Sequence, residues 1–281
     1  MTQSYRQVHE APAPPARRRT RALVVLVLGF AGAVAGWLLM NALGPEAYTR
    51  SAHIARATAS LVLGVALWAG LTRWYDGRLP RLDRTVLRRF GWGFAWYAGT
   101  AGAVAVALLA TGLIRFELHG SVLDLVLQTA LLLVLVLALE AIPEELIMRD
   151  LIQRSLTALA GRWLAVVGQA VLFVAWGWLI GAATSIDRIV LFFVFSIVQG
   201  LTRMWTGTVA ATIGFHAAFQ LIAQMLLGDS WPVVELIDPD RWFELAVAAP
   251  ALVVPLAAYQ MRTRSAGSSQ SPSPGAVSKT S

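Results

Sequence analysis

Two adjacent carboxylates follow a proline near the middle of the chain, and an arginine lies one helical turn away. Glu144 and Glu145 come directly after Pro143, and Arg149 lies four residues beyond Glu145. Residues four apart share one face of a helix, so Glu145 and Arg149 can form an ion pair. Glu144 lies about 100° round the same helix and is free to act as a general base. The alternative is that these charges lie among lipid headgroups at the end of a membrane span.

A second polar pair lies inside a later apolar run. His216 and Gln220 are four residues apart within residues 207–228, so both side chains share one helix face. They could line a common site, or they could form the hydrogen bonds between helices that are common in membrane bundles. Other polar residues in the two preceding apolar runs are predicted to serve helix packing: Gln169, Gln199 and Arg203.

The composition shows which solvent surrounds these residues. Of the 281 residues 57% are hydrophobic and only 14% are charged, whereas a soluble domain carries roughly 25% charged residues. Lipid must therefore surround most of the fold. The absence of cysteine excludes disulfides, thiolate metal sites and cysteine catalysis. The net charge of +7 comes from arginines beside apolar runs, so membrane lipids, and not nucleic acid, are the expected partners.

The apolar runs predict an all-α, polytopic transmembrane helix bundle. Spanning a bilayer takes about 20 apolar residues, and eight runs meet or approach that length: 22–43, 52–72, 91–114, 121–142, 163–182, 188–205, 207–228 and 243–261. The transmembrane domain is thus expected over residues 22–261. Residues 1–21 and 262–281 have no apolar periodicity and are predicted to be disordered tails.

The distribution of charge predicts the orientation of the bundle. Arginines cluster in the tail before the first run, and loop 73–89 contains six arginines against two aspartates. Cytoplasmic loops carry an excess of positive charge, so both segments are expected inside. The acidic loop 229–241 then falls outside. We therefore expect a multi-pass protein of the cell membrane with both termini in the cytoplasm.

Both polar pairs match motifs of one known family. Glu144-Glu145-Leu-Ile-Met-Arg149 resembles the EExxxR motif of the CPBP intramembrane proteases, which include the CAAX prenyl endopeptidases and many bacterial relatives. The segment from His216 to Gln220 is similar to the later HxxxN motif, with glutamine in place of asparagine. The resemblance implies that Glu144 activates water and that Glu145 and Arg149 hold the site together. It also implies that His216 and Gln220 stabilise the oxyanion.

The family's middle motif is only partly present. The resemblance covers roughly residues 120–230, and the middle motif, FxxxH, aligns with Phe173-Val-Ala-Trp-Gly177. Phe173 is then expected to contact the substrate, whereas glycine replaces the histidine at position 177. This loss argues against a zinc site with two histidines, and we expect no metal or other cofactor. A metal site of carboxylates or of one histidine stays open.

The sequence is compatible with three functions. The first is an intramembrane endopeptidase that cleaves a peptide or membrane-protein substrate in a cavity open to the cytoplasm. The second is an inactive member of the family that acts as a membrane scaffold, an immunity factor or a partner-binding protein, which Gly177 favours. The third, a transporter or channel, is disfavoured because the other runs contain few charged residues.

Overall fold

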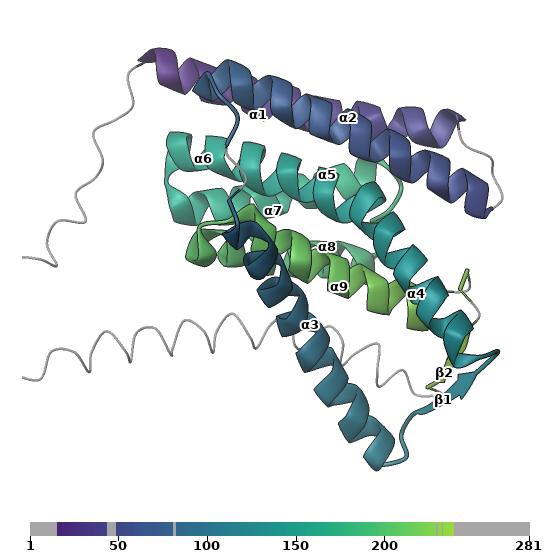
Figure 1. Cartoon of the computed structure of the whole chain (residues 1–281). Helices are drawn as coiled ribbons and strands as arrows, with labels where there is room; N and C mark the ends of the chain where they lie inside the picture. The colour runs from purple at the N-terminus through teal and green to yellow at the C-terminus, as the bar shows by residue number, and fades with distance from the viewer. Residues whose placement is uncertain (1–15, 44–48, 81–82, 229, 232, 239–281) are drawn as a thin grey trace, which may run out of the picture.

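The computed structural model describes residues 16–43, 49–80, 83–228, 230–231 and 233–238, which form a helical bundle with one small sheet (Figure 1). The long helices outside the central one are α1 Ala16–Leu43, α2 Arg50–Asp76, α3 Thr85–Ala110, α7 Arg162–Leu179, α8 Ile186–Thr206 and α9 Val209–Leu226. With the central helix of residues 122–160, seven helices in the described part of the chain are long and apolar enough to cross a membrane. The predicted all-α polytopic bundle is confirmed. The predicted eighth span, 243–261, and the predicted tails at 1–15 and 262–281 lie outside the described residues.

The first helix begins earlier than the sequence analysis predicts. α1 starts at Ala16, so residues 16–21 are helical, and their assignment to a disordered tail is wrong. Arginine is a good helix former, and its long side chain can reach the headgroups from the end of a span. The arginine cluster therefore lies on the first turns of the helix that forms the first span.

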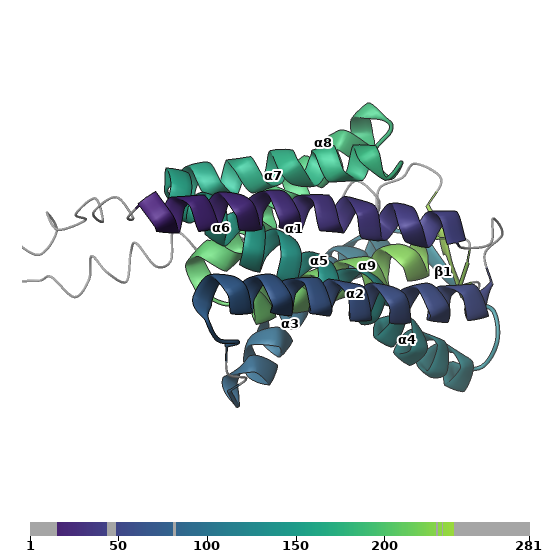
Figure 2. The same ribbon diagram turned by 90° about the horizontal axis from the view of Figure 1, so that it is seen from above.

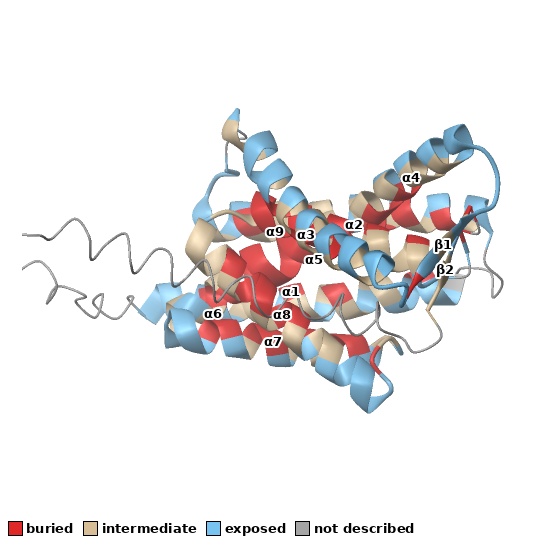
Figure 3. Cartoon of the chain, turned by 90° about the horizontal axis from the view of Figure 1, so that it is seen from below, coloured by how far each residue is buried: buried red, intermediate tan, exposed pale blue. Residues whose placement is uncertain are grey.

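The helices pack around the central one in three groups. α1 and α2 lie side by side on one face, and α7 and α8 pair next to α1 (Figures 1 and 2). α3 packs along α9 on the other side of the bundle. Figure 3 shows buried residues concentrated where α5, α6, α8 and α9 face one another, while the outward faces are exposed. Large apolar side chains on those outward faces, such as Leu87 and Val122, are placed to meet lipid.

The central helix does not end where the sequence analysis predicts. It runs without a break through α4 Val122–Val136, η1 Leu137–Ala141, α5 Ile142–Glu145, η2 Leu146–Ile152 and α6 Gln153–Ala160. The two η segments are π-helical turns on either side of Pro143. Proline removes a backbone donor and crowds the preceding turn, and a π-bulge can absorb that disturbance without ending the helix. The predicted boundary at residue 142 is therefore wrong.

The continued helix keeps the acidic motif inside the protein. Glu144 is 8% exposed, and Glu145 and Arg149 are 0% exposed. This burial contradicts the alternative in which these charges lie among lipid headgroups. Their position within a span makes them candidates for function, because ionisable groups in lipid are costly.

A two-stranded sheet was not predicted. β1 Arg115–Leu118 pairs antiparallel with β2 Val234–Ile237, and Glu117 lies opposite Glu235. The sheet joins the connection between α3 and α4 to the segment after α9, at one end of the bundle (Figure 1). The starts of α1 and α3 and the end of α2, with their arginines, lie at the opposite end.

The contact between α3 and α9 generates a first prediction. A side chain at Gly93 would collide with the backbone of Ala211, because the two helices approach very closely there. Gly93→Val should therefore destabilise the protein by roughly 1–3 kcal/mol, measured as a lower Tm of the purified chain. Gly99→Val on the same helix is the control, since nothing lies within 4 Å of its added carbon. Equal Tm values for both variants would contradict this packing.

Candidate active site

A buried ion pair lies at the centre of the site. Arg149 Nη1 lies 3.3 Å from Glu145 Oε1, as the spacing of four residues predicts. The guanidinium stacks over the ring of Phe173, with 4.7 Å from Cζ to the ring centroid. Its other amino group donates a hydrogen bond to Ser196 Oγ at 3.2 Å. Phe173, which is expected to contact substrate, thus also supports the arginine.

Glu145 orients the histidine of α9. Its Oε1 atom lies 3.0 Å from His216 Nδ1 and accepts a hydrogen bond from Gln199 Nε2 at 3.2 Å. An ionised carboxylate can only accept, so the proton between them belongs to Nδ1. The other ring nitrogen, Nε2, then faces Glu144, and its distance from Glu144 Oε2 is 4.0 Å. The structure therefore brings together four of the predicted site residues, Glu144, Glu145, Arg149 and His216.

Gln199 is a member of this network that the sequence analysis did not assign to the site. Its amide donates to Glu145 and also to the carbonyl oxygen of Thr212, at 3.0 Å, so it links α8 to the central helix and to α9. Ser196 is also bonded to Gln169, which lies on α7. A signal existed in the sequence, because Ser196, Gln199 and Arg203 recur on one face of an otherwise apolar helix.

A cavity of about 840 Å³, here named the polar cavity, contains the reactive side chains. Glu144, His216 and Gln220 line it together. Glu140 lines the same cavity and accepts hydrogen bonds from Gln224 at 3.1 and 3.3 Å. Phe173 also borders this cavity. All the predicted site residues except the paired Glu145 and Arg149 therefore reach one shared space.

The mouth of the polar cavity lies at the end of the bundle that carries the sheet. Its exposed lining residues come from the end of α1, the connection between α7 and α8, the start of α8 and the segment after α9: Asn41, Gly181, Asp187, Arg188, Leu227 and Gly228. The arginine-rich ends of α1, α2 and α3 lie at the opposite end. If the arginine-rich end faces the cytoplasm, as the charge distribution predicts, the cavity opens on the outer side. The predicted opening to the cytoplasm does not agree with this orientation.

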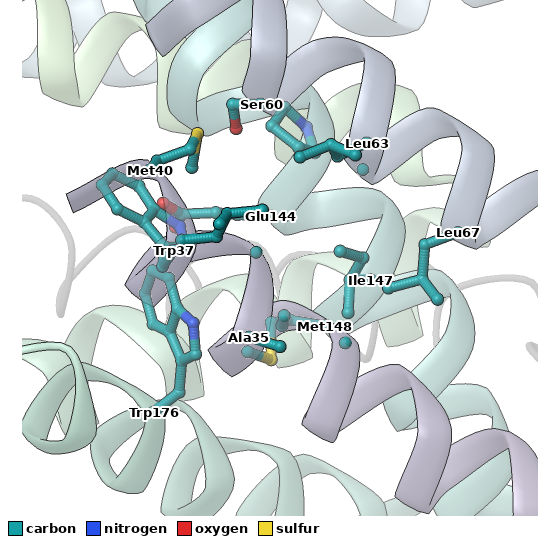
Figure 4. A pocket seen from close by; sticks show the side chains of 16 residues that line it. Ala35, Trp37, Met40, Ser60, Leu63, Leu67, Glu144, Ile147, Met148 and Trp176 are labelled. Atoms are coloured by element: carbon teal, nitrogen blue, oxygen red, sulfur yellow. The ribbon is translucent and has the colours of Figure 1, made fainter. Parts of the chain in front are cut away.

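A smaller cavity of about 310 Å³, here named the apolar cavity, lies between α1, α2 and α5 (Figure 4). Its walls include Leu63, Leu67 and Met148. Glu144 lines both cavities, as do Trp37 and Trp176, whose rings meet edge to face at 5.8 Å. Glu144 therefore lies at the boundary between a polar and an apolar space.

The place of the missing histidine is filled by an aromatic ring. A β-carbon added at Gly177 would lie 2.5 Å from Phe192 Cε1 and 3.2 Å from Ala183 Cβ. Phe192 belongs to α8 and lines the polar cavity. The loss of the histidine from α7 is therefore accompanied by local packing that leaves no space for its side chain.

The described residues contain one group of three possible metal ligands within 4.8 Å of one another. It consists of Glu117, His119 and Glu235 on the exposed sheet. His119 Nε2 lies 2.8 Å from Glu235 Oε2, so this pair is already joined. The acidic residues and the histidine of the polar cavity form no such group in the described part of the chain.

Comparison with known proteins supports the resemblance. Residues 126–222 match the family model described as type II CAAX prenyl endopeptidase Rce1-like. The matched segment includes both motifs, the one from Glu144 to Arg149 and the one from His216 to Gln220, and it confirms the predicted relationship. No curated protein matches the chain. With its membrane-crossing helices, the chain is a multi-pass membrane protein with an Rce1-like segment.

The buried ion pair generates a second prediction. Arg149→Met should lower the free energy of unfolding by about 3–5 kcal/mol, because it leaves Glu145 charged and buried without its cation. The double variant Glu145→Gln/Arg149→Met should lose clearly less free energy of unfolding than the two single variants lose together. Chemical denaturation of the four proteins in one detergent measures the coupling. Additive effects would show that the two residues do not depend on each other.

Proposed function

We propose that the chain is an intramembrane endopeptidase of the CAAX-protease type, in which Glu144 activates the water that attacks a peptide bond. The observation that carries this proposal is the placement of Glu144 Oε2 opposite His216 Nε2 at 4.0 Å in one buried cavity. That distance is too long for a direct hydrogen bond and suits one water molecule held by both atoms. The Rce1-like match of residues 126–222 supports the same chemistry at the level of the family.

The reaction follows from the positions of these groups. The water oxygen forms a bond to the carbonyl carbon of the substrate while one water proton passes to Glu144. Glu144 then gives this proton to the leaving nitrogen as the carbon–nitrogen bond breaks. His216 Nε2 accepts a hydrogen bond from the second O–H of the water and takes that proton as the acid product forms. Glu145 stabilises the resulting imidazolium, as a carboxylate does for the histidine of a catalytic triad.

This arrangement changes the role first assigned to His216. With its Nδ1 proton given to Glu145, the neutral ring has no donor left at Nε2 for an oxyanion. We assign oxyanion stabilisation to the amide of Gln220 instead, which lies one turn further along α9 and lines the polar cavity. Arg149 is a positioning residue, since it keeps Glu145 ionised and does not line that cavity.

The orientation that we propose for the chain rests on the distribution of its charge. We place the arginine-rich ends of α1, α2 and α3 in the cytoplasm of the cell membrane, and the chain termini with them. The polar cavity then opens on the outer side. The substrate that suits this arrangement is a peptide, or a segment of a membrane protein, that reaches the outer half of the bilayer.

A second candidate is an inactive family member that binds a partner. Gly177 and the ring of Phe192 favour it, because together they remove the histidine of the middle motif and the space for it. The two functions differ in whether the protein cleaves a peptide in a reaction that requires Glu144 and His216.

The third prediction tests turnover directly. Glu144→Gln and His216→Ala should each lower kcat by about 10²–10⁴-fold, since each removes a group that handles a proton. The measurement is cleavage of a fluorogenic peptide library by the purified full-length protein in lipid nanodiscs. Glu117→Gln is the matched control, because this exposed carboxylate lies on β1 and does not line the polar cavity. Wild-type cleavage rates in Glu144→Gln would exclude the mechanism.

The fourth prediction concerns the filled histidine position. Gly177→His alone should lower Tm and leave cleavage no faster, because its side chain meets the ring of Phe192. The double variant Gly177→His/Phe192→Ala has room for the imidazole and should cleave faster than Phe192→Ala alone. If the histidine adds nothing to that background, position 177 does not face the reacting atoms.

A further inference from the structure

Glu140 forms a separate polar layer in the cavity, nearer to its mouth than Glu144. The central helix runs from the sheet end of the bundle inward, so Glu140 on η1 precedes Glu144 by one turn. α9 runs in the opposite direction, and Gln224 lies two turns beyond His216. The hydrogen bonds from Gln224 to both oxygens of Glu140 therefore form an outer layer above the pair of Glu144 and His216.

The mechanism gives Glu140 no role, yet its carboxylate is kept in a largely enclosed space. Its hydrogen-bond partner is a neutral amide, and no arginine or lysine of the described residues forms an ion pair with it. A carboxylate that leaves water without a cation is costly unless something compensates for the lost hydration. Glu145 shows the contrast, because Arg149 neutralises it at 3.3 Å.

The lining of the polar cavity as a whole favours positive charge. Three carboxylates line it, those of Glu140, Glu144 and Asp187, against one guanidinium, that of Arg188 at the mouth. Aromatic rings form much of the remaining wall, and aromatic faces attract organic cations. These rings belong to Trp37, Phe173, Trp176, Phe192, Phe195 and Phe219. Acidic groups and aromatic walls are independent features that select the same kind of ligand.

We propose that Glu140, held by Gln224, is a subsite for the cationic side chain of a lysine or arginine in the bound peptide. The substrate class rests on the proposed endopeptidase function. Four helical residues separate Glu140 from Glu144, a rise of about 6 Å. An extended peptide advances about 3.3 Å per residue, so the basic residue lies two positions from the scissile bond, on the side of the mouth.

The test compares two peptides that differ in one charge. Fluorescently labelled Ala-Ala-Lys-Ala-Ala and its norleucine analogue are titrated against full-length protein in nanodiscs of zwitterionic lipid, and binding is measured by anisotropy. The wild type should bind the lysine peptide at least about tenfold more tightly, because a partly desolvated charge pair forms. Glu140→Gln should abolish this preference, since the amide keeps the shape and Gln224 can reverse its own amide to bond with it.

Two variants and a second readout complete the experiment. Asp187→Asn removes an exposed carboxylate at the mouth and should keep most of the preference, while Glu140→Asp should keep part of it. Equal affinities for both peptides in the wild type, or a preference that survives Glu140→Gln, would overturn the subsite. Cleavage is followed separately. A lysine preference without any cleavage would contradict the endopeptidase alone, and cleavage without the preference would contradict the subsite alone.

Discussion

The ion pair between Glu145 and Arg149 is the constraint on which the site depends. Two charges that are fully buried in a membrane bundle must neutralise each other. α7 supports the arginine with the ring of Phe173, and α8 contributes Ser196 and Gln199. Because Arg149 neutralises Glu145, Glu145 can stay buried and orient His216. Arg149 is thus paired with Glu145, and Glu144 lines the cavity without a cation as its partner in the described part of the chain.

The backbone of the central helix makes this arrangement possible. Within a bilayer each N–H and C=O must be bonded internally, so a polar motif cannot be placed on an open loop. The π-helical turns on either side of Pro143 keep the helix continuous while the bulges change its pitch. Glu140 and Glu144 consequently face the polar cavity, whereas Glu145 and Arg149 face the interior of the bundle.

The features of this structure that can be predicted from the sequence are those that depend on short stretches of the chain. Apolar length fixes the seven spans within the described residues, and the spacing of four fixes the pairing of Glu145 with Arg149. The role of Gln199 and the ring beside Gly177 could not be predicted in this way. Each depends on which faces of distant helices meet, and hydropathy does not report that. The side on which the cavity opens depends on the same packing.

The most direct test of the proposed mechanism is a high-resolution cryo-electron microscopy map of the full-length protein in lipid nanodiscs, with ordered water resolved at the site. The mechanism predicts one water within about 2.7–3.0 Å of both Glu144 Oε2 and His216 Nε2, with Nδ1 of the same ring bonded to Glu145. A direct hydrogen bond between Glu144 and His216, or a ring turned away from Glu145, would contradict it.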